Sequence, residues 1–310
     1  MSFVYTGARR RGGLATIAVL TAVLSTSACQ CGSKPIPDVA SSSFRMDRDA
    51  LAFPNFVTGY DSSALDTAAM QRMFGDKVCT PGSTPCELTS AARTFMEQAN
   101  TSMSGGRCEG FAVLSDLMAA KKVDPKTFGA DTARELTLDD NTPLQKEIAY
   151  WFATQLVPGA VGSKTKQYTA KDVLGVLADS LEDTATEHYR IGIVRKNGAS
   201  ISGGHSLTPI GFYRDPKATG VYWLRVYDNN HPEVERLMKL DTVKNRWEFE
   251  SNTNPNAPSR LYFGDSSNNN PIYLAPVFAR QGVLPCPFCE GGGAQVVTTG
   301  GAQPSITTPT

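Results

Sequence analysis

Apolar residues in the first half of the chain recur at the spacing of one helix face. Side chains three, four and seven positions apart lie on the same side of a helix, so this spacing predicts amphipathic helices. Residues at the start of several runs are typical N-terminal capping signals. The predicted helices begin at Ser62 or Ser63, at Thr89 or Ser90, at or just after Cys108, at Thr142 and at Thr169.

The second half of the chain is richer in β-branched and aromatic residues, in short runs separated by turn residues. Such runs predict strands. Because helices come first and strands follow, we expect an α+β fold in which an N-terminal helical lobe packs on a C-terminal antiparallel β-sheet. No clear linker separates the halves, so one domain is predicted over residues 46–280. The predicted strands cover residues 188–196, 203–213, 220–228, 236–240, 246–250 and 271–278.

Two of these runs, 203–213 and 220–228, are predicted to form a hairpin whose turn is centred near Lys217. His205 lies about twelve residues before that centre and Asp228 about eleven after it, so an in-register hairpin places them side by side. A carboxylate that accepts the N–H of one ring nitrogen fixes the imidazole tautomer and stabilises the imidazolium. The pair is half of a catalytic apparatus, and a nucleophile is needed to complete it.

The composition is that of an ordinary globular protein. The chain has 310 residues, 41% of them hydrophobic, with 30 basic and 30 acidic side chains. Zero formal net charge gives no support for nucleic-acid binding, which needs a basic face. No apolar run outside the N-terminus reaches the length of a membrane span.

The N-terminus has the features of an export signal. A basic stretch at residues 9–11 precedes an apolar stretch at 14–24 and small residues up to Ala28. Together with Cys29, this segment resembles a bacterial lipoprotein signal, which implies removal of residues 1–28 and lipidation of Cys29. A plain signal peptide that ends at Ala28 is the alternative. The resemblance implies a lipoprotein of the bacterial cell envelope, at the outer membrane or facing the periplasm, anchored to the membrane by its lipid.

Both ends of the predicted domain are flanked by segments with little to bury. Residues 29–45, which include Cys31, are expected to form a flexible tether, and Cys31 has no assigned role. Residues 281–310 comprise a CxxC segment and a Gly- and Thr-rich tail that is predicted to be disordered.

Four further cysteines form two close pairs, Cys79 with Cys86 and Cys286 with Cys289. In an oxidising compartment both pairs are predicted to be structural disulfides. A redox dithiol at the second pair and a zinc site built from all four are the alternatives. Cys108 is left unpaired, which makes it a candidate nucleophile.

Cys108 is predicted to open a helix directly after the glycine turn at residues 105–106. The positive end of the helix dipole and the unpaired N–H groups of a first turn favour a thiolate. The same N–H groups can stabilise a developing oxyanion. The alternative is a buried cysteine that serves only as a small apolar side chain.

Three short segments resemble papain-like cysteine peptidase domains of bacterial exported and surface proteins. Residues 106–111 (GRCEGF) resemble the Gly-x-Cys-x-Gly-(Met/Phe) start of their nucleophile helix. Residues 204–209 (GHSLTP) resemble their His-Ala-Val-Thr-Pro strand, and residues 226–232 (VYDNNHP) resemble their Val-Tyr-Asp-Asn-Asn-Tyr-Pro segment. The resemblance implies a papain-like fold for this chain and a triad of cysteine, histidine and aspartate.

Carried over residue by residue, the resemblance makes Cys108 the nucleophile, His205 the base and Asp228 the residue that orients His205. Asn229 is the alternative orienting residue, although adjacent strand residues point to opposite faces. Papain-like enzymes usually place a glutamine about six residues before the cysteine, and here that position is Ser102. The nearest side chains that could complete an oxyanion hole are Gln98 and Asn100.

The resemblance implies a cysteine hydrolase that cleaves amide bonds in proteins, peptides or cell-wall peptide stems. Two alternatives remain open: a non-catalytic binding module, which the missing glutamine favours, and a transglutaminase-type acyltransferase with the same triad. A metal site made from His205, Asp228 and His231 would leave the position of Cys108 unexplained. We therefore expect no metal and no cofactor.

Overall fold

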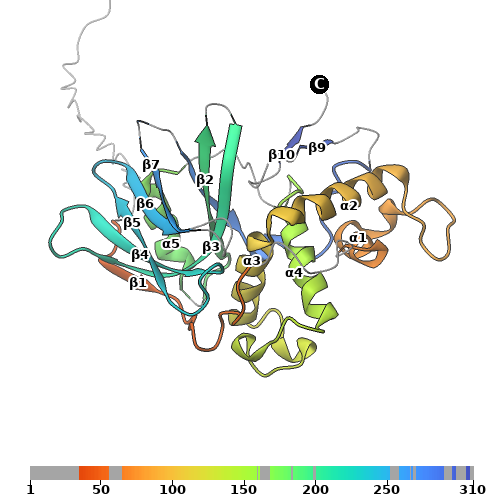
Figure 1. Ribbon diagram of the computed structural model, residues 1–310, viewed down its shortest axis with the longest axis horizontal. Coiled ribbons are helices and arrows are strands. Elements are labelled where there is room, and N and C mark those ends of the chain that lie inside the picture. The colour runs from red at the N-terminus through yellow and green to blue at the C-terminus, as the bar shows by residue number, and fades with distance from the viewer. Residues whose placement is uncertain are drawn as a thin grey trace, which may run out of the picture. The chain divides into compact units, whose positions relative to one another are not determined.

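A computed structural model describes most of the chain (Figure 1). The predicted signal peptide, the predicted lipidation site Cys29, and Cys31 lie outside the described residues. The described residues are 35–55, 65–158, 160, 168–182, 184–197, 200–251, 258–265, 267, 270–289, 295–297 and 305–307.

Five α-helices form in the described part of the chain, each within or overlapping a run of helical apolar spacing. Two of their caps differ from the predicted ones. Asp66 accepts the N–H of Ala69 at the start of the first helix, and Asn141 accepts that of Leu144 at the start of the fourth. Aspartate and asparagine are both strong N-caps because a short side-chain oxygen reaches the first-turn N–H groups. The helices are α1 (Thr67–Phe74), α2 (Ser90–Ser102), α3 (Cys108–Ala119), α4 (Thr142–Thr154) and α5 (Ala170–Ser180), with short 3₁₀ turns η1 (Gly75–Val78), η2 (Met103–Gly105), η3 (Pro125–Phe128), η4 (Ala133–Glu135) and η5 (Phe278–Arg280).

Within the described residues, one antiparallel sheet of eight strands dominates, in the order β7-β6-β5-β4-β3-β2-β8, with β1 also paired to β3. Two strands in it were not predicted, β1 in the expected tether and β7. A separate pair, β9 and β10, lies in the tail that was expected to be disordered. The strands are β1 (Val39–Ser41), β2 (Tyr189–Asn197), β3 (Ser200–Arg214), β4 (Val221–Asp228), β5 (Arg236–Asp241), β6 (Arg246–Ser251), β7 (Arg260–Gly264), β8 (Ile272–Pro276), β9 (Gln295–Val297) and β10 (Ser305–Thr307).

The sheet curls into a half-barrel around α5 (Figure 1). Strands β2 and β7 are not neighbours in the sheet, yet the guanidinium of Arg195 on β2 lies 4.7 Å from the ring centre of Tyr262 on β7. Helix α5 buries Val173, Leu174 and Leu177 against the inner side chains of the strands. The sheet therefore closes a hydrophobic core of its own with a single helix.

The predicted fold class, a papain-like helical lobe packed on a sheet, is wrong. The described chain is mostly antiparallel sheet with few helices, and α1 to α4 form a second hydrophobic cluster separate from that of the sheet. Where α3 meets β3, several contacts are polar: the Thr208 hydroxyl donates to the carbonyl of Ala112 at 3.1 Å and lies 3.5 Å from the Ser115 hydroxyl. Order along the chain predicted the sequence of elements, but not that the sheet would curl and enclose its own core.

The predicted disulfides Cys79–Cys86 and Cys286–Cys289 are both confirmed. The second lies in the segment after β8, which packs on the helical cluster. There Leu284 N–H donates to the carbonyl of Met73, and Phe288 lies against Phe74 with ring centres 5.2 Å apart. The two bridges are compatible with an exported protein. Among the described helices, none combines the length and the apolar character needed to cross a bilayer.

Candidate active site

The predicted nucleophile, Cys108, is the first residue of α3. It is half-buried, and it is the free cysteine among the described residues. The helix begins here because Gly106 takes φ of +110°, a conformation that favours glycine, and so ends the preceding 3₁₀ turn. Arg107 provides no side-chain cap for the first turn. The N-cap side chain therefore does not occupy the first-turn N–H groups of α3, which an oxyanion site requires.

Asn55, which the sequence did not single out, holds the turn before Cys108. Its side-chain oxygen accepts the N–H of Arg107 at 2.7 Å, and its amide lies so close to Gly106 that a Cβ there would be 2.8 Å from Nδ2. The same amide donates to the side chain of Asn230. A lone asparagine in a loop carries no sequence signal for this role, because all of its partners are more than fifty residues away.

His205 lies within β3, Asp228 is the last residue of β4, and their side chains meet in the interior of the protein. The carboxylate oxygen Oδ1 lies 2.7 Å from Nε2 of the imidazole, and both side chains are fully buried. Asp228 is held in turn by the Ser251 hydroxyl, which donates to Oδ2 at 2.7 Å, and by the N–H of Asn230, which donates to Oδ1 at 2.9 Å. Both oxygens of the carboxylate are thus engaged, which fixes the position of the group that orients the imidazole.

The hairpin register differs from the predicted one by two residues. Asp228 is directly opposite Leu207, and the ladder shifts between Pro209 and Gly211. His205 is therefore the diagonal neighbour of Asp228, on the same face of the sheet and within reach of a long side chain. Counting residues from the centre of the turn predicted that His205 and Asp228 lie close together. It could not predict the shift in strand register next to Pro209, which has no N–H to donate to the neighbouring strand.

The electrostatics of the pair favour a charged imidazole. Burial lowers the pKa of His205, but the Asp228 carboxylate and the nearby Cys108 sulfur outweigh burial and raise that pKa well above its ordinary value. Burial raises the pKa of Asp228, whereas His205 and the hydrogen-bond donors around the carboxylate outweigh it and bring that pKa below its ordinary value. Nε2 is occupied by Asp228, and Nδ1 is buried without a hydrogen bond of standard geometry to any described residue. Nδ1 is thus the ring atom left for Cys108.

Asn229, the alternative orienting residue, does not take that place. Its side-chain amide donates to two carbonyls, that of Cys108 at 3.1 Å and that of Ser206 at 2.8 Å. It points away from His205 because it follows Asp228 in the chain and faces the other side. Asn229 instead joins the start of α3 to β3, which fixes the backbone of the nucleophile relative to that of the base.

The structure does not bring Asn100 to the site. Its side chain bonds the N–H and the carbonyl of Leu65, at 2.9 and 3.1 Å, and so holds the segment before α1. Gln98 lies half-buried on α2, and its role in an oxyanion hole stays a prediction. No group of three or more histidine, cysteine or acidic side chains that could hold a metal ion occurs in the described part of the chain.

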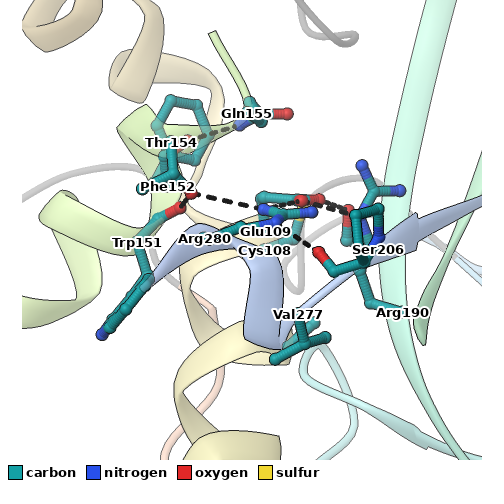
Figure 2. A network of polar contacts seen from close by, with 12 residues as sticks. Cys108, Glu109, Trp151, Phe152, Thr154, Gln155, Arg190, Ser206, Val277 and Arg280 are labelled. Carbon is teal, nitrogen blue, oxygen red and sulfur yellow. Dashed lines mark hydrogen bonds and ion pairs between the residues drawn. The ribbon is translucent and has the colours of Figure 1, made fainter. Parts of the chain in front are cut away.

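A buried ionic cluster lies directly behind the nucleophile (Figure 2). The carboxylate of Glu109 accepts Nε of Arg190 and Nη1 of Arg280, each at 2.6 Å, and the hydroxyl of Ser206 at 2.5 Å. Burial raises the pKa of Glu109, but the two guanidinium groups and the hydroxyl outweigh it and lower that pKa to about 2. Thr154 of α4 completes the cluster beside Arg280. Glu109 is the second residue of a mostly apolar helix, and the sequence did not identify its buried partners.

Comparison with protein-family models, with curated proteins and with solved structures found no match to this chain. Arguments about its function therefore depend on the geometry of the site and on the motifs in the sequence.

Proposed function

We propose that this chain is an exported thiol hydrolase that cleaves amide bonds, with Cys108 as nucleophile, His205 as general acid and base, and Asp228 as the residue that orients His205. The observation that carries the proposal is the buried imidazole, which has a carboxylate on Nε2 and the free thiol of Cys108 beside the ring. A raised histidine pKa matches a thiolate–imidazolium pair, the resting state in which a cysteine is most nucleophilic.

In the proposed reaction the Cys108 thiolate attacks the carbonyl carbon of the amide, and the first-turn N–H groups of α3 receive the developing oxyanion. The imidazolium of His205 gives its Nδ1 proton to the leaving amine as the C–N bond breaks, which leaves a thioester. A water molecule then attacks the thioester after it gives a proton to Nδ1. The carboxylic acid leaves, and the thiolate and imidazolium are restored.

The motif resemblance supports proteins, peptides or cell-wall peptide stems as substrates. The N-terminal sequence and the two disulfides support a location in the bacterial cell envelope, with a lipid on Cys29 as the membrane anchor. A carboxylate-held histidine next to a free thiol is not needed by a pure binding module, which makes hydrolysis the function that this site favours over that alternative.

The test is the pH dependence of iodoacetamide alkylation at Cys108, followed by mass spectrometry of the mature chain. We expect a labelling midpoint well below the ~8.5 of a free thiol, and a return toward that value in His205→Ala. Hydrolysis of a library of peptides and cell-wall peptide stems, with Cys108→Ala as the inactive control, would then identify the substrate class. A thiol that reacts like a free cysteine and ignores His205→Ala would refute the proposal.

A further inference from the structure

The cluster behind Cys108 carries more positive than negative charge. Its one carboxylate, on Glu109, faces two guanidinium groups, those of Arg190 and Arg280, and the three side chains are at most 3% exposed. The low pKa of Glu109 keeps it ionised at neutral pH, and arginine remains protonated in proteins. Nη2 of Arg280 is buried and has no hydrogen-bond partner in the described part of the chain. These three side chains therefore carry one net positive charge, and the carboxylate of Glu187 acts on Arg280 from outside the cluster.

The activated triad has the opposite imbalance. A thiolate on Cys108, an imidazolium on His205 and a carboxylate on Asp228 sum to one net negative charge, of which the histidine and aspartate parts are fully buried. An uncompensated charge in a buried site is strongly unfavourable unless a counter-charge is close by. Protonation of the thiolate while His205 stays an imidazolium, by contrast, brings the net charge of the triad to zero, so a nearby positive charge favours the reactive thiolate over the thiol.

We propose that the Glu109–Arg190–Arg280 cluster is the counter-charge that stabilises the activated form of the triad. This inference rests on the proposed function, since it requires Cys108 to act as a thiolate. Two residues of this region directly follow triad residues in the chain. Glu109 follows Cys108 on α3, and Ser206 follows His205 on β3. The hydrogen bond from Ser206 to Glu109 at 2.5 Å ties these two positions together.

Stability alone does not require such a cluster. Buried ionic groups can often be replaced by apolar side chains with no loss of stability. The two arginines come from β2 and from the turn η5 after β8, and Glu109 comes from α3, so three elements that are distant in the sequence contribute to the cluster (Figure 2).

Other charged groups around the start of α3 stay unchanged in the variants below. Arg107 is buried directly before the first residue of α3, and Asp116, two turns along that helix, pairs with His188 of the segment before β2. Glu187, close to Arg280, binds the backbone N–H groups of residues 277–279. Because these charges are the same throughout, differences between variants report the cluster alone.

The experiment changes the cluster charge in both directions and follows the midpoint of the pH profile for Cys108 alkylation in the mature chain. Glu109→Gln removes the one negative charge of the cluster and so makes its net charge more positive by one, and we expect the midpoint to fall by about one pH unit. Arg280→Met removes one, and we expect a rise of similar size. The double variant restores the net charge of the native cluster, and its alkylation midpoint should return most of the way to the native value. Arg280→Lys conserves the charge and is expected to rescue the shift seen in Arg280→Met.

Three controls separate this role from a structural one. Arg225→Met removes a guanidinium from a partly exposed ion pair with Glu235 and should leave the profile unchanged. Near-ultraviolet circular dichroism checks the fold of each variant, and Arg190→Met gives the same charge change if Arg280→Met does not fold. Shifts of the two single variants in the same direction, or a double variant worse than either, would overturn the counter-charge role. If the native thiol is not activated at all, the proposed function fails instead, so the two failures are distinguishable.

Discussion

Gly110 lies at a backbone contact between α3 and α4, two residues after Cys108. A Cβ added there would be 2.0 Å from the carbonyl oxygen of Ile148 and 3.1 Å from its Cγ2. The backbone of a helix cannot rotate away as a flexible side chain can. Gly110→Ala must therefore push the two helices apart.

The size of the effect follows from the contact distance. The new Cβ needs about 3.4 Å for ordinary contact with the Ile148 oxygen, so the helices must separate by about 1.4 Å. Overpacking of this kind destabilises by about 3 kcal/mol, and the better helix propensity of alanine returns about 1 kcal/mol. We expect the free energy of unfolding to fall by about 2 kcal/mol. A displacement of this size at the start of α3 should also lower hydrolysis about a hundredfold.

Urea unfolding measures the stability change, with Gly175→Ala as the matched control. Gly175 is also inside a helix, α5, but a Cβ there meets nothing within 4 Å. The control should be neutral or up to about 1 kcal/mol more stable, because alanine is the better helix former. If Gly110→Ala were as stable as Gly175→Ala and retained activity, the close packing of α3 on α4 would be refuted as the reason for glycine.

Two further predictions concern acid stability and the anchor. The pKa of Glu109 falls from an ordinary 4.5 to about 2 on folding. The contribution of its ionised carboxylate to the free energy of unfolding is therefore complete above the pKa of the unfolded state, and it is lost as the pH falls through the pKa of the folded state. Between pH 7 and pH 3 this loss is about 2 kcal/mol; in urea titrations Glu109→Gln should show a pH dependence smaller by that amount, and an unchanged slope would contradict the assignment. The lipid anchor is tested by mass spectrometry and detergent partitioning of the full chain: Cys29→Ser should lose the lipid mass and enter the aqueous phase, whereas a native protein without that mass would exclude the anchor.

Local sequence signals predicted most of the elements correctly. The start of α3 at Cys108 follows from a glycine turn and a run of apolar residues, and the disulfide Cys79–Cys86 follows from two cysteines that bracket a short loop. Strand β7 was missed because residues 260–264 form a short run, and β1 was missed because the segment was assigned to a tether.

The candidate site was predictable only in part. His205 and Asp228 belong to neighbouring strands of one hairpin, so a count along the chain brought them close even with the register two residues off. Asn229 was weighed as an orienting residue, but the structure gives it the carbonyls of Cys108 and Ser206 instead. Side chains of a strand point alternately to its two faces, which argued against an orienting role for Asn229. This alternation could not predict that Asn229 binds the carbonyls of Cys108 and Ser206.

The sequence by itself determined where the described helices and most of the described strands form, where the two disulfides close, and which cysteine, histidine and aspartate are the candidates for the chemistry. These features depend on residues close together in the chain, whose caps, spacing and alternation act locally. Only the tertiary structure decided that the sheet curls around α5 with its own core, and that Glu109 meets Arg190 and Arg280 behind the nucleophile. Those contacts join residues 81 and 171 positions apart, and burial of charge becomes favourable only after the fold has brought the partners together.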